Sequence, residues 1–284
     1  MRGGLSPRGY TIVEVMIFLA ISGFMFIIAA AFVSGKQSRV EFRQGMNDIN
    51  TQVQQVINDV SNGFYPSNSD FSCSASPGVL TINSGLPKEQ GANWGCVFLG
   101  KVIQLGVSGS NGANYGVYTV AGSQFANGAA SGNPPSDFAE ALPKTVDYGA
   151  GGPNLTQINT LQWGLRATDM YDNGTKLSAI GFMGSFASQS AGSLESGSQT
   201  VNVVDIIPST AIDIGGESEP TMVTHINGGI TNLNLEPHPK VLMCFDGGRG
   251  EFGSLTIGGS SSSQKLATSI QIYTDSTSWH SAGC

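Results

Sequence analysis

The sequence predicts an α+β protein in which a long N-terminal helix packs on a C-terminal, antiparallel β-sheet body. Three observations support this fold class. An apolar run near the N-terminus continues, without proline, into a segment whose apolar residues recur at helical spacing. Beyond residue 70, short runs of branched and aromatic residues alternate with turn-forming Gly, Pro, Asn and Ser. The composition changes along the chain as well, so we expect a helical segment over 10–62 and a globular domain over 63–284.

The apolar run extends from Tyr10 to Val33, and Glu14 is the only charged residue within it. At about 1.5 Å per residue, a helix of this length crosses a hydrocarbon layer about 30 Å thick. A secretory signal peptide cleaved near Ala29 and Ala31 is the alternative, but its apolar core is usually about 7 to 15 residues long and uncharged. We therefore expect a transmembrane helix, with Glu14 near the interface and the helix N-terminus, whose dipole favours a negative charge.

The helix is expected to continue beyond the membrane to about Ser61, because no proline occurs between Pro7 and Pro66. Its second half carries an apolar stripe at helical spacing, opposite a face of Asn, Gln and Asp. The stripe consists of Met46, Ile49, Val53, Val56, Ile57 and Val60. Such a stripe predicts packing on a sheet of the same chain, and Asn62 and Gly63 predict the end of the helix.

The body is predicted to be built from short strands. They cover residues 79–82, 97–107, 116–120, 161–168, 177–186, 201–207, 241–245, 254–257 and 269–273. We expect an antiparallel sheet that packs on the part of the helix outside the membrane. Asp172, Asn173 and Gly174 predict a hairpin turn, and residues 246–250 predict another connection of two strands.

The composition is typical of a β-rich, loop-rich exported domain. The 284 residues include 39 Gly, about twice the average share, whereas charged residues make up 12%, about half the usual share. The net charge of −7 argues against a large basic surface for nucleic acid or anionic lipid.

Four cysteines lie outside the apolar run and lack the CxxC spacing of zinc sites and thioredoxin-like proteins. They are Cys73, Cys96, Cys244 and Cys284. Three pairings are possible, and buried free thiols are a further alternative. The pairing of sequence neighbours joins Cys73 to Cys96 and Cys244 to Cys284. We expect disulfides, because the body is expected to lie in an oxidising compartment.

No residue pattern predicts catalysis, a cofactor or a metal centre. The segment GGRGEFG at 247–253 has GxGxxG spacing but lies between two predicted strands, whereas a dinucleotide site needs a turn from a strand into a helix. It therefore predicts a turn. His225, His238 and His280 are isolated and lack metal-ligand spacing.

Two acidic sets carry the carboxylate and amide oxygens that calcium prefers as ligands. They are Asp169, Asp172 and Asn173, and Asp213, Glu217 and Glu219. Neither set has EF-hand spacing, so both predict solvated turns. The tryptophans, Trp94, Trp163 and Trp279, are expected in the core rather than on a binding surface.

The N-terminus resembles the prepilin signal of type IV pilins and type II secretion pseudopilins. A basic leader ending in Arg8 and Gly9 is followed by Tyr10, Thr11, two aliphatic residues, Glu14 and the apolar run. The resemblance covers residues 1–60, about a fifth of the chain. Two departures are that Tyr10 stands where the family usually has Phe, and that a proline often found midway along the apolar helix is absent.

This resemblance implies that a prepilin peptidase removes residues 1–9 by cleavage after Gly9, and that the new amine of Tyr10 is methylated. In a filament, Glu14 is then expected to pair with the Tyr10 amine of a neighbouring subunit and to set the register between helices. An unpaired interfacial charge is the alternative role for Glu14.

The expected function is structural, not enzymatic, with no cofactor. The chain resembles a subunit that is held in the cytoplasmic membrane with its body outside and is then assembled into a type IV pilus, as a major or minor pilin. Expected partners are the prepilin peptidase, other pilin-like subunits, an inner-membrane assembly platform and membrane lipid. A pseudopilin of a type II secretion system, or a singly anchored module that binds an extracellular ligand and does not polymerise, are the alternatives.

Overall fold

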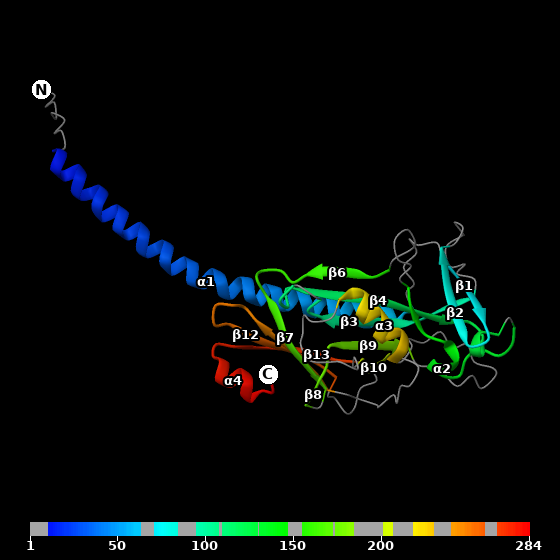
Figure 1. The fold of residues 1–284 in the computed structure, drawn as a ribbon. Helices are drawn as coiled ribbons and strands as arrows, with labels where there is room; N and C mark the ends of the chain where they lie inside the picture. Colours follow the sequence, from blue (N-terminus) through cyan, green and yellow to red (C-terminus); the bar gives the residue numbers. More distant parts are fainter. Residues whose placement is uncertain are drawn as a thin grey trace, which may run out of the picture.

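A computed structural model shows a rod-like helix that projects from a β-rich body (Figure 1). The structure describes residues 11–63, 71–84, 95–107, 110–129, 131–146, 155–172, 174–184, 201–206, 218–229, 240–258 and 266–284. These residues include the long helix and the strands of the body, so the predicted α+β class is confirmed for this part of the chain.

The long helix α1 extends over Ile12–Ser61 and has 50 residues, which corresponds to about 75 Å. It begins after Thr11, whose side chain accepts a hydrogen bond from the Glu14 backbone N–H. It ends where the Asn62 N–H donates to the Asn58 carbonyl oxygen. The predicted end near Ser61 is therefore confirmed. The helix is continuous and gently curved (Figure 1).

The two halves of α1 lie in different surroundings. Side chains of residues 11–30 are exposed, whereas the predicted apolar stripe of the second half is buried, together with Phe42. The buried stripe packs on strands of the body, as its spacing predicted. Near the end of α1, Asp59 forms an ion pair with Lys101 of β3, in which Lys101 Nζ donates to Asp59 Oδ2 at 2.6 Å. This pair links the last turns of the helix to the larger sheet.

In the part of the chain that the structure describes, the strands form two main sheets and a ribbon, and all their pairings are antiparallel. The larger sheet has the order β10 (Val201–Ile206), β9 (Ala179–Gly184), β3 (Cys96–Leu105), β4 (Asn114–Ser123) and β5 (Lys144–Thr145), with β6 (Gln157–Thr160) also paired to β4. The second sheet has the order β13 (Thr268–Tyr273), β12 (Phe252–Ile257), β11 (Val241–Asp246), β7 (Arg166–Asp172) and β8 (Thr175–Lys176). The ribbon consists of β1 (Phe71–Ser76) and β2 (Val79–Ser84).

The buried half of α1 and both main sheets share one hydrophobic core. The side chains of the larger sheet belong to two cores, because successive side chains along a strand point to opposite faces of the sheet. Ile103 of β3 joins the core under α1, whereas the neighbouring Val102 joins a second core on the other face. Two short helices, α2 (Phe138–Ala141) and α3 (Glu219–Gly229), supply side chains to that second core. The larger sheet is therefore covered on both faces.

The structure corrects the strand predictions in three respects. Residues 161–165 form a turn, and the strand predicted over 161–168 begins only at Arg166, because Trp163 and Gly164 have φ of 62° and 72°. Two main sheets are present where one was expected. Seven short elements were not predicted: β1, β5, β6, β8 and the helices α2, α3 and α4 (Ser276–Ser281). Most of them are too short to carry periodicity, whereas β1 is rich in serine and α3 contains Pro and Gly, which do not favour a strand or a helix.

Candidate functional site

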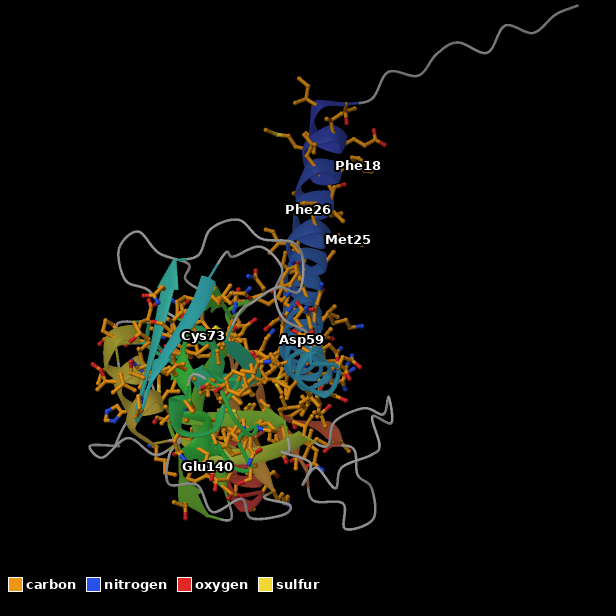
Figure 2. All side chains as sticks on the ribbon, turned by 90° about the vertical axis from the view of Figure 1, so that its right-hand side faces the viewer. Phe18, Met25, Phe26, Asp59, Cys73 and Glu140 are labelled. Atoms are coloured by element: carbon orange, nitrogen blue, oxygen red, sulfur yellow. A yellow bond between two sulfur atoms is a disulfide. The ribbon has the colours of Figure 1, made fainter. Side chains whose placement is uncertain are left out.

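The first half of α1 is an apolar surface that nothing in the described chain covers. From Ile12 to Ile28 its large hydrophobic side chains have exposed fractions between 46% and 80%. Phe18, Met25 and Phe26 project from the helix well away from the body (Figure 2). Burying apolar surface is favourable by about 25 cal/mol per Å², so this surface is suited to contact with lipid or with other apolar protein surface.

The local sequence explains why one helix has two such different halves. Residues 12–30 are apolar around the whole helix and are long enough to cross a membrane, by length and composition. In the second half, polar residues occupy one face, so only a stripe is suited to a core. A single N-terminal helix thus carries a segment that could span a membrane and a segment that belongs to the body.

Glu14 lies in the first turn of α1, as predicted. Its backbone N–H donates to Thr11 Oγ1 at 3.3 Å and to the Thr11 carbonyl oxygen at 3.1 Å. The order Thr-x-x-Glu is the pattern of a capping box, a signal that sequence reasoning missed. Within the described part of the chain, the Glu14 carboxylate has no cation at ion-pair distance. Gly9 and Tyr10, the predicted cleavage and methylation positions, lie outside the described residues.

The four cysteines form two disulfides, Cys73–Cys96 and Cys244–Cys284. The pairing of sequence neighbours is therefore the one present, and none of the four cysteines is free. The first disulfide joins β1 of the ribbon to β3, and the second joins β11 to Cys284, three residues after the end of α4. Disulfides persist in oxidising compartments, so they suggest an extracellular location for the body.

The C-terminal helix α4 is held by three contacts besides its disulfide. Asp275 caps it by accepting from the Ser278 N–H at 2.7 Å, a bond that lowers the pKa of the Asp275 carboxyl. The Trp279 indole N–H donates to the Gly253 carbonyl oxygen at 3.2 Å, and its ring stacks on Phe252. The C-terminal segment is thus attached to β12 and β11.

The glycine-rich segment at 247–253 is the connection between β11 and β12, so the predicted turn is confirmed. Asp246 Oδ1 accepts from the Gly248 N–H at 2.7 Å within this turn. Gly247 and Gly253 face α1 closely. A Cβ added at Gly247 would lie 2.6 Å from a ring carbon of Phe42, and one at Gly253 would lie 2.8 Å from the sulfur of Met46. These glycines permit close approach of the hairpin to α1, a role that the sequence pattern did not indicate.

The candidate metal ligands that the structure describes, acidic residues and histidines, do not lie together. Among the described residues, no group of three potential ligands lies close enough to hold a metal ion. Asp169 pairs with Lys176 at 2.7 Å, and Glu219 begins α3. His225 lies on α3, and Nδ1 of His280 lies 3.0 Å from the Cys284 carbonyl oxygen. Four other members of these sets lie outside the described residues: Asn173, Asp213, Glu217 and His238.

The prediction that the tryptophans lie in the core is correct for Trp279 and wrong for Trp163. Trp279 is buried, whereas Trp163 has an exposed fraction of 47%. The left-handed backbone of Trp163, at the turn between β6 and β7, places its ring at the surface. Trp94 lies outside the described residues.

Comparisons with protein-family models, with curated proteins and with solved structures found no match to this chain.

Proposed function

We propose that this protein is a structural, non-enzymatic pilin-like subunit that assembles through the first half of α1. The observation that carries the proposal is the division of one continuous helix into a half buried in its own body and an apolar half left exposed. A subunit of this kind is stored in a membrane and later packed beside copies of itself. The prepilin-like residues Gly9, Tyr10 and Glu14 give the same assignment from the sequence.

In this proposal, lipid covers the exposed half before assembly, and neighbouring helices cover it afterwards. Because lipid tails are as apolar as the side chains, exchanging one for the other supplies little net hydrophobic free energy. Close packing and paired charges then determine whether the filament forms and in which register.

Glu14 supplies one of the paired charges in the proposed assembly. Removal of residues 1–9 after Gly9 by a prepilin peptidase creates a positive amine on Tyr10, which is then methylated. That amine lies four residues before Glu14 in the sequence, so the two charges of one subunit can each meet the opposite charge of a neighbour. A charge pair among apolar helices disfavours other registers, because slippage leaves both charges unpaired.

The body is proposed to lie outside the cytoplasmic membrane, on a filament of the type IV pilus class. Its two disulfides and the acidic net charge of −7 of the whole chain suit an exported domain. Beyond the peptidase and other pilin-like subunits, the partners are membrane lipid and an inner-membrane assembly platform that moves the subunit from the membrane into the filament.

The proposal is tested by mass spectrometry of the mature N-terminus, on protein purified from its own host membrane and from the sheared filament fraction. The expected result is a chain that starts at Tyr10 and carries a methyl group. A chain that starts near Phe32 would indicate ordinary secretion. Filaments whose subunits retain residues 1–9 would contradict the proposal.

A further inference from the structure

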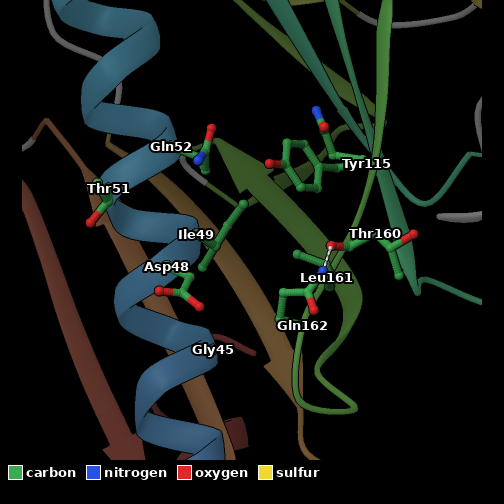
Figure 3. A pocket seen from close by; sticks show the side chains of 10 residues that line it. Gly45, Asp48, Ile49, Thr51, Gln52, Tyr115, Thr160, Leu161 and Gln162 are labelled. Atoms are coloured by element: carbon green, nitrogen blue, oxygen red, sulfur yellow. Dashed lines mark hydrogen bonds between the residues drawn. The ribbon is translucent and has the colours of Figure 1, made fainter.

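A cavity of about 340 Å³ lies between α1, β4 and the segment that begins with β6 (Figure 3). Asp48 and Gln52 line it from α1, Tyr115 from β4, and Asn159 and Gln162 from the facing segment. The volume lies within the range of about 300 to 1,000 Å³ that is typical of small-molecule sites. The cavity lies on the body, and its first lining residue in the sequence, Gly45, comes 15 residues after Ala30, the last residue of the exposed apolar segment.

The elements that form the cavity are firmly placed. Tyr115 and Asn159 face each other across the β4–β6 pairing. On the opposite wall, the absence of a side chain at Gly45 lets the turn approach α1, because a Cβ there would lie 3.2 Å from the Gln162 carbonyl oxygen. Ile49, whose side chain is buried, belongs to the core beneath. The cavity is thus enclosed by α1, by the paired strands β4 and β6 and by the turn that follows β6.

Polar groups face the cavity without protein partners. Tyr115 is 6% exposed, and in the described part of the chain no hydrogen bond reaches its hydroxyl. Figure 3 shows this hydroxyl and the Gln52 amide directed into the space between the strand and the helix. These groups are accessible from the cavity and can form hydrogen bonds with a molecule that enters it, so this lining is suited to a polar guest. Burial and then the Asp48 charge raise the pKa of Tyr115, so its hydroxyl stays a donor at neutral pH.

An exposed aromatic ring and a carboxylate meet at the edge of the cavity. The Trp163 indole N–H donates to Asp48 Oδ2 at 3.3 Å. Among the described residues, Asp48 has no cation at ion-pair distance. Trp163 is held outward by a left-handed backbone, with φ of 62°, and is 47% exposed. A large ring kept in solvent at this strained position offers a flat apolar face beside a hydrogen-bond acceptor.

We propose that this cavity binds a neutral sugar residue, such as a hexose or an N-acetylhexosamine. A sugar ring presents hydroxyls at its edge and C–H groups on its faces. The amides of Gln52 and Asn159 both donate and accept, as hydroxyl recognition requires, and Asp48 accepts only. In this proposal the ring of Trp163, which follows the lining residue Gln162 and is hydrogen-bonded to the lining residue Asp48, covers the C–H groups. The Asp48 charge disfavours sugars that carry a carboxylate, since like charges repel in a partly enclosed site.

The lining argues against a simple cation as the guest. A cation needs acceptors alone, and the protonated Tyr115 hydroxyl and two amide NH₂ groups are donors. The mixture of donors and acceptors around one carboxylate therefore favours a hydroxylated ligand.

The test uses the full chain in a detergent without a sugar headgroup. Binding is measured by tryptophan fluorescence and by saturation-transfer NMR, with methyl glycosides of glucose, galactose, mannose, N-acetylglucosamine and N-acetylgalactosamine. Glucuronic acid and N-acetylneuraminic acid are the acidic probes. At least one neutral sugar is expected to bind, and the acidic sugars at least about tenfold more weakly. The sugar that binds is then measured again at the end of a polymer-bound glycan. Tighter binding of the polymer-bound form would indicate a surface glycan as the natural ligand, and equal binding a free sugar.

Variants locate the site. Asp48→Asn is expected to weaken the neutral sugar about tenfold and to reduce discrimination against acidic sugars, which corresponds to the loss of one charged acceptor. Trp163→Asn is expected to weaken sugar binding, which is followed by NMR because this variant lacks the fluorescent ring. Asn is chosen because it tolerates the left-handed backbone. Gln52→Ala is expected to weaken binding, whereas Gln44→Ala is the matched control on an exposed face of the same helix outside the cavity.

Three results would overturn the proposal. The first is that no neutral sugar binds at millimolar concentration while circular dichroism shows a folded protein. The second is that binding is the same in Asp48→Asn and Trp163→Asn as in the parent. The third is that arginine methyl ester binds and the sugars do not. Since the unassembled protein is measured, a failure here leaves the assembly proposal unaffected.

Discussion

Two glycines of the β11–β12 hairpin determine how closely the body approaches α1. At Gly247 an added methyl group would meet the ring of Phe42, and at Gly253 it would meet the Met46 thioether. Both partners are buried, so neither can move far without disturbing the core. The hairpin thus needs glycine for space as well as for its turn.

At the residue scale, we predict that Gly247→Ala lowers the free energy of unfolding by about 1–3 kcal/mol, because overpacking displaces the Phe42 ring from the core. Urea unfolding followed by circular dichroism in detergent measures the effect. Gly228→Ala on α3 is the matched control, since nothing lies within 4 Å of the added methyl group there. Equal stability of Gly247→Ala and Gly228→Ala would show that the ring has room.

At the element scale, α1 and the C-terminal segment are attached to the sheets in different ways. α1 contributes an apolar stripe to the shared core, and its burial is continuous over several turns. In the short helix α4 Trp279 is the single buried residue, and a disulfide links the chain just after this helix to β11. The covalent bond therefore supplies stability that a helix of this size does not obtain from packing.

We predict that removing the disulfide with Cys244→Ala and Cys284→Ala lowers the free energy of unfolding by about 4 kcal/mol. The residues are 40 apart in sequence, and a closed loop of that length restricts the unfolded chain by about this amount. Urea unfolding of the oxidised parent and the variant measures the difference. Near-ultraviolet circular dichroism reports whether Trp279 remains packed. A variant as stable as the parent would mean that packing alone holds α4.

At the scale of the whole molecule, the apolar first half of α1 extends from a globular body, and the chain as a whole is acidic, with a net charge of −7 (Figure 2). The first half of α1 is exposed in the single chain and is suited to contact with lipid or with the same helix of other subunits. The second half of α1 and the sheets of the body share a closed core. Assembly through the first half of α1 would leave the cavity beside Asp48 on the body, outside the packed helices. The proposed sugar site would then be repeated along a filament, which raises avidity for a glycan surface.

We predict that Glu14→Ala leaves membrane insertion intact and lowers incorporation into filaments at least about tenfold. Loss of a charge from an apolar segment does not oppose insertion, but it leaves the Tyr10 amine of the neighbour unpaired. The ratio of subunit in sheared filaments to subunit in membranes measures incorporation. Glu41→Gln, on the second half of the same helix, is the control. Normal incorporation of Glu14→Ala would remove the role assigned to this carboxylate.

The sequence by itself determined the long helix, its apolar half, its buried stripe and the β11–β12 turn. These features depend on neighbours within a few residues, because helical periodicity and turn chemistry are local. Glu14 could be placed at the helix start for the same reason, although its capping-box partner Thr11 was overlooked.

Only the tertiary structure decided the division into two sheets, the choice among three cysteine pairings, the outward Trp163 and the cavity beside Asp48. Each depends on residues far apart in the chain, such as Asp48 and Trp163, which the hydrogen bond brings together across 115 positions. Contacts of that kind form when whole elements pack, and no spacing along the chain records them.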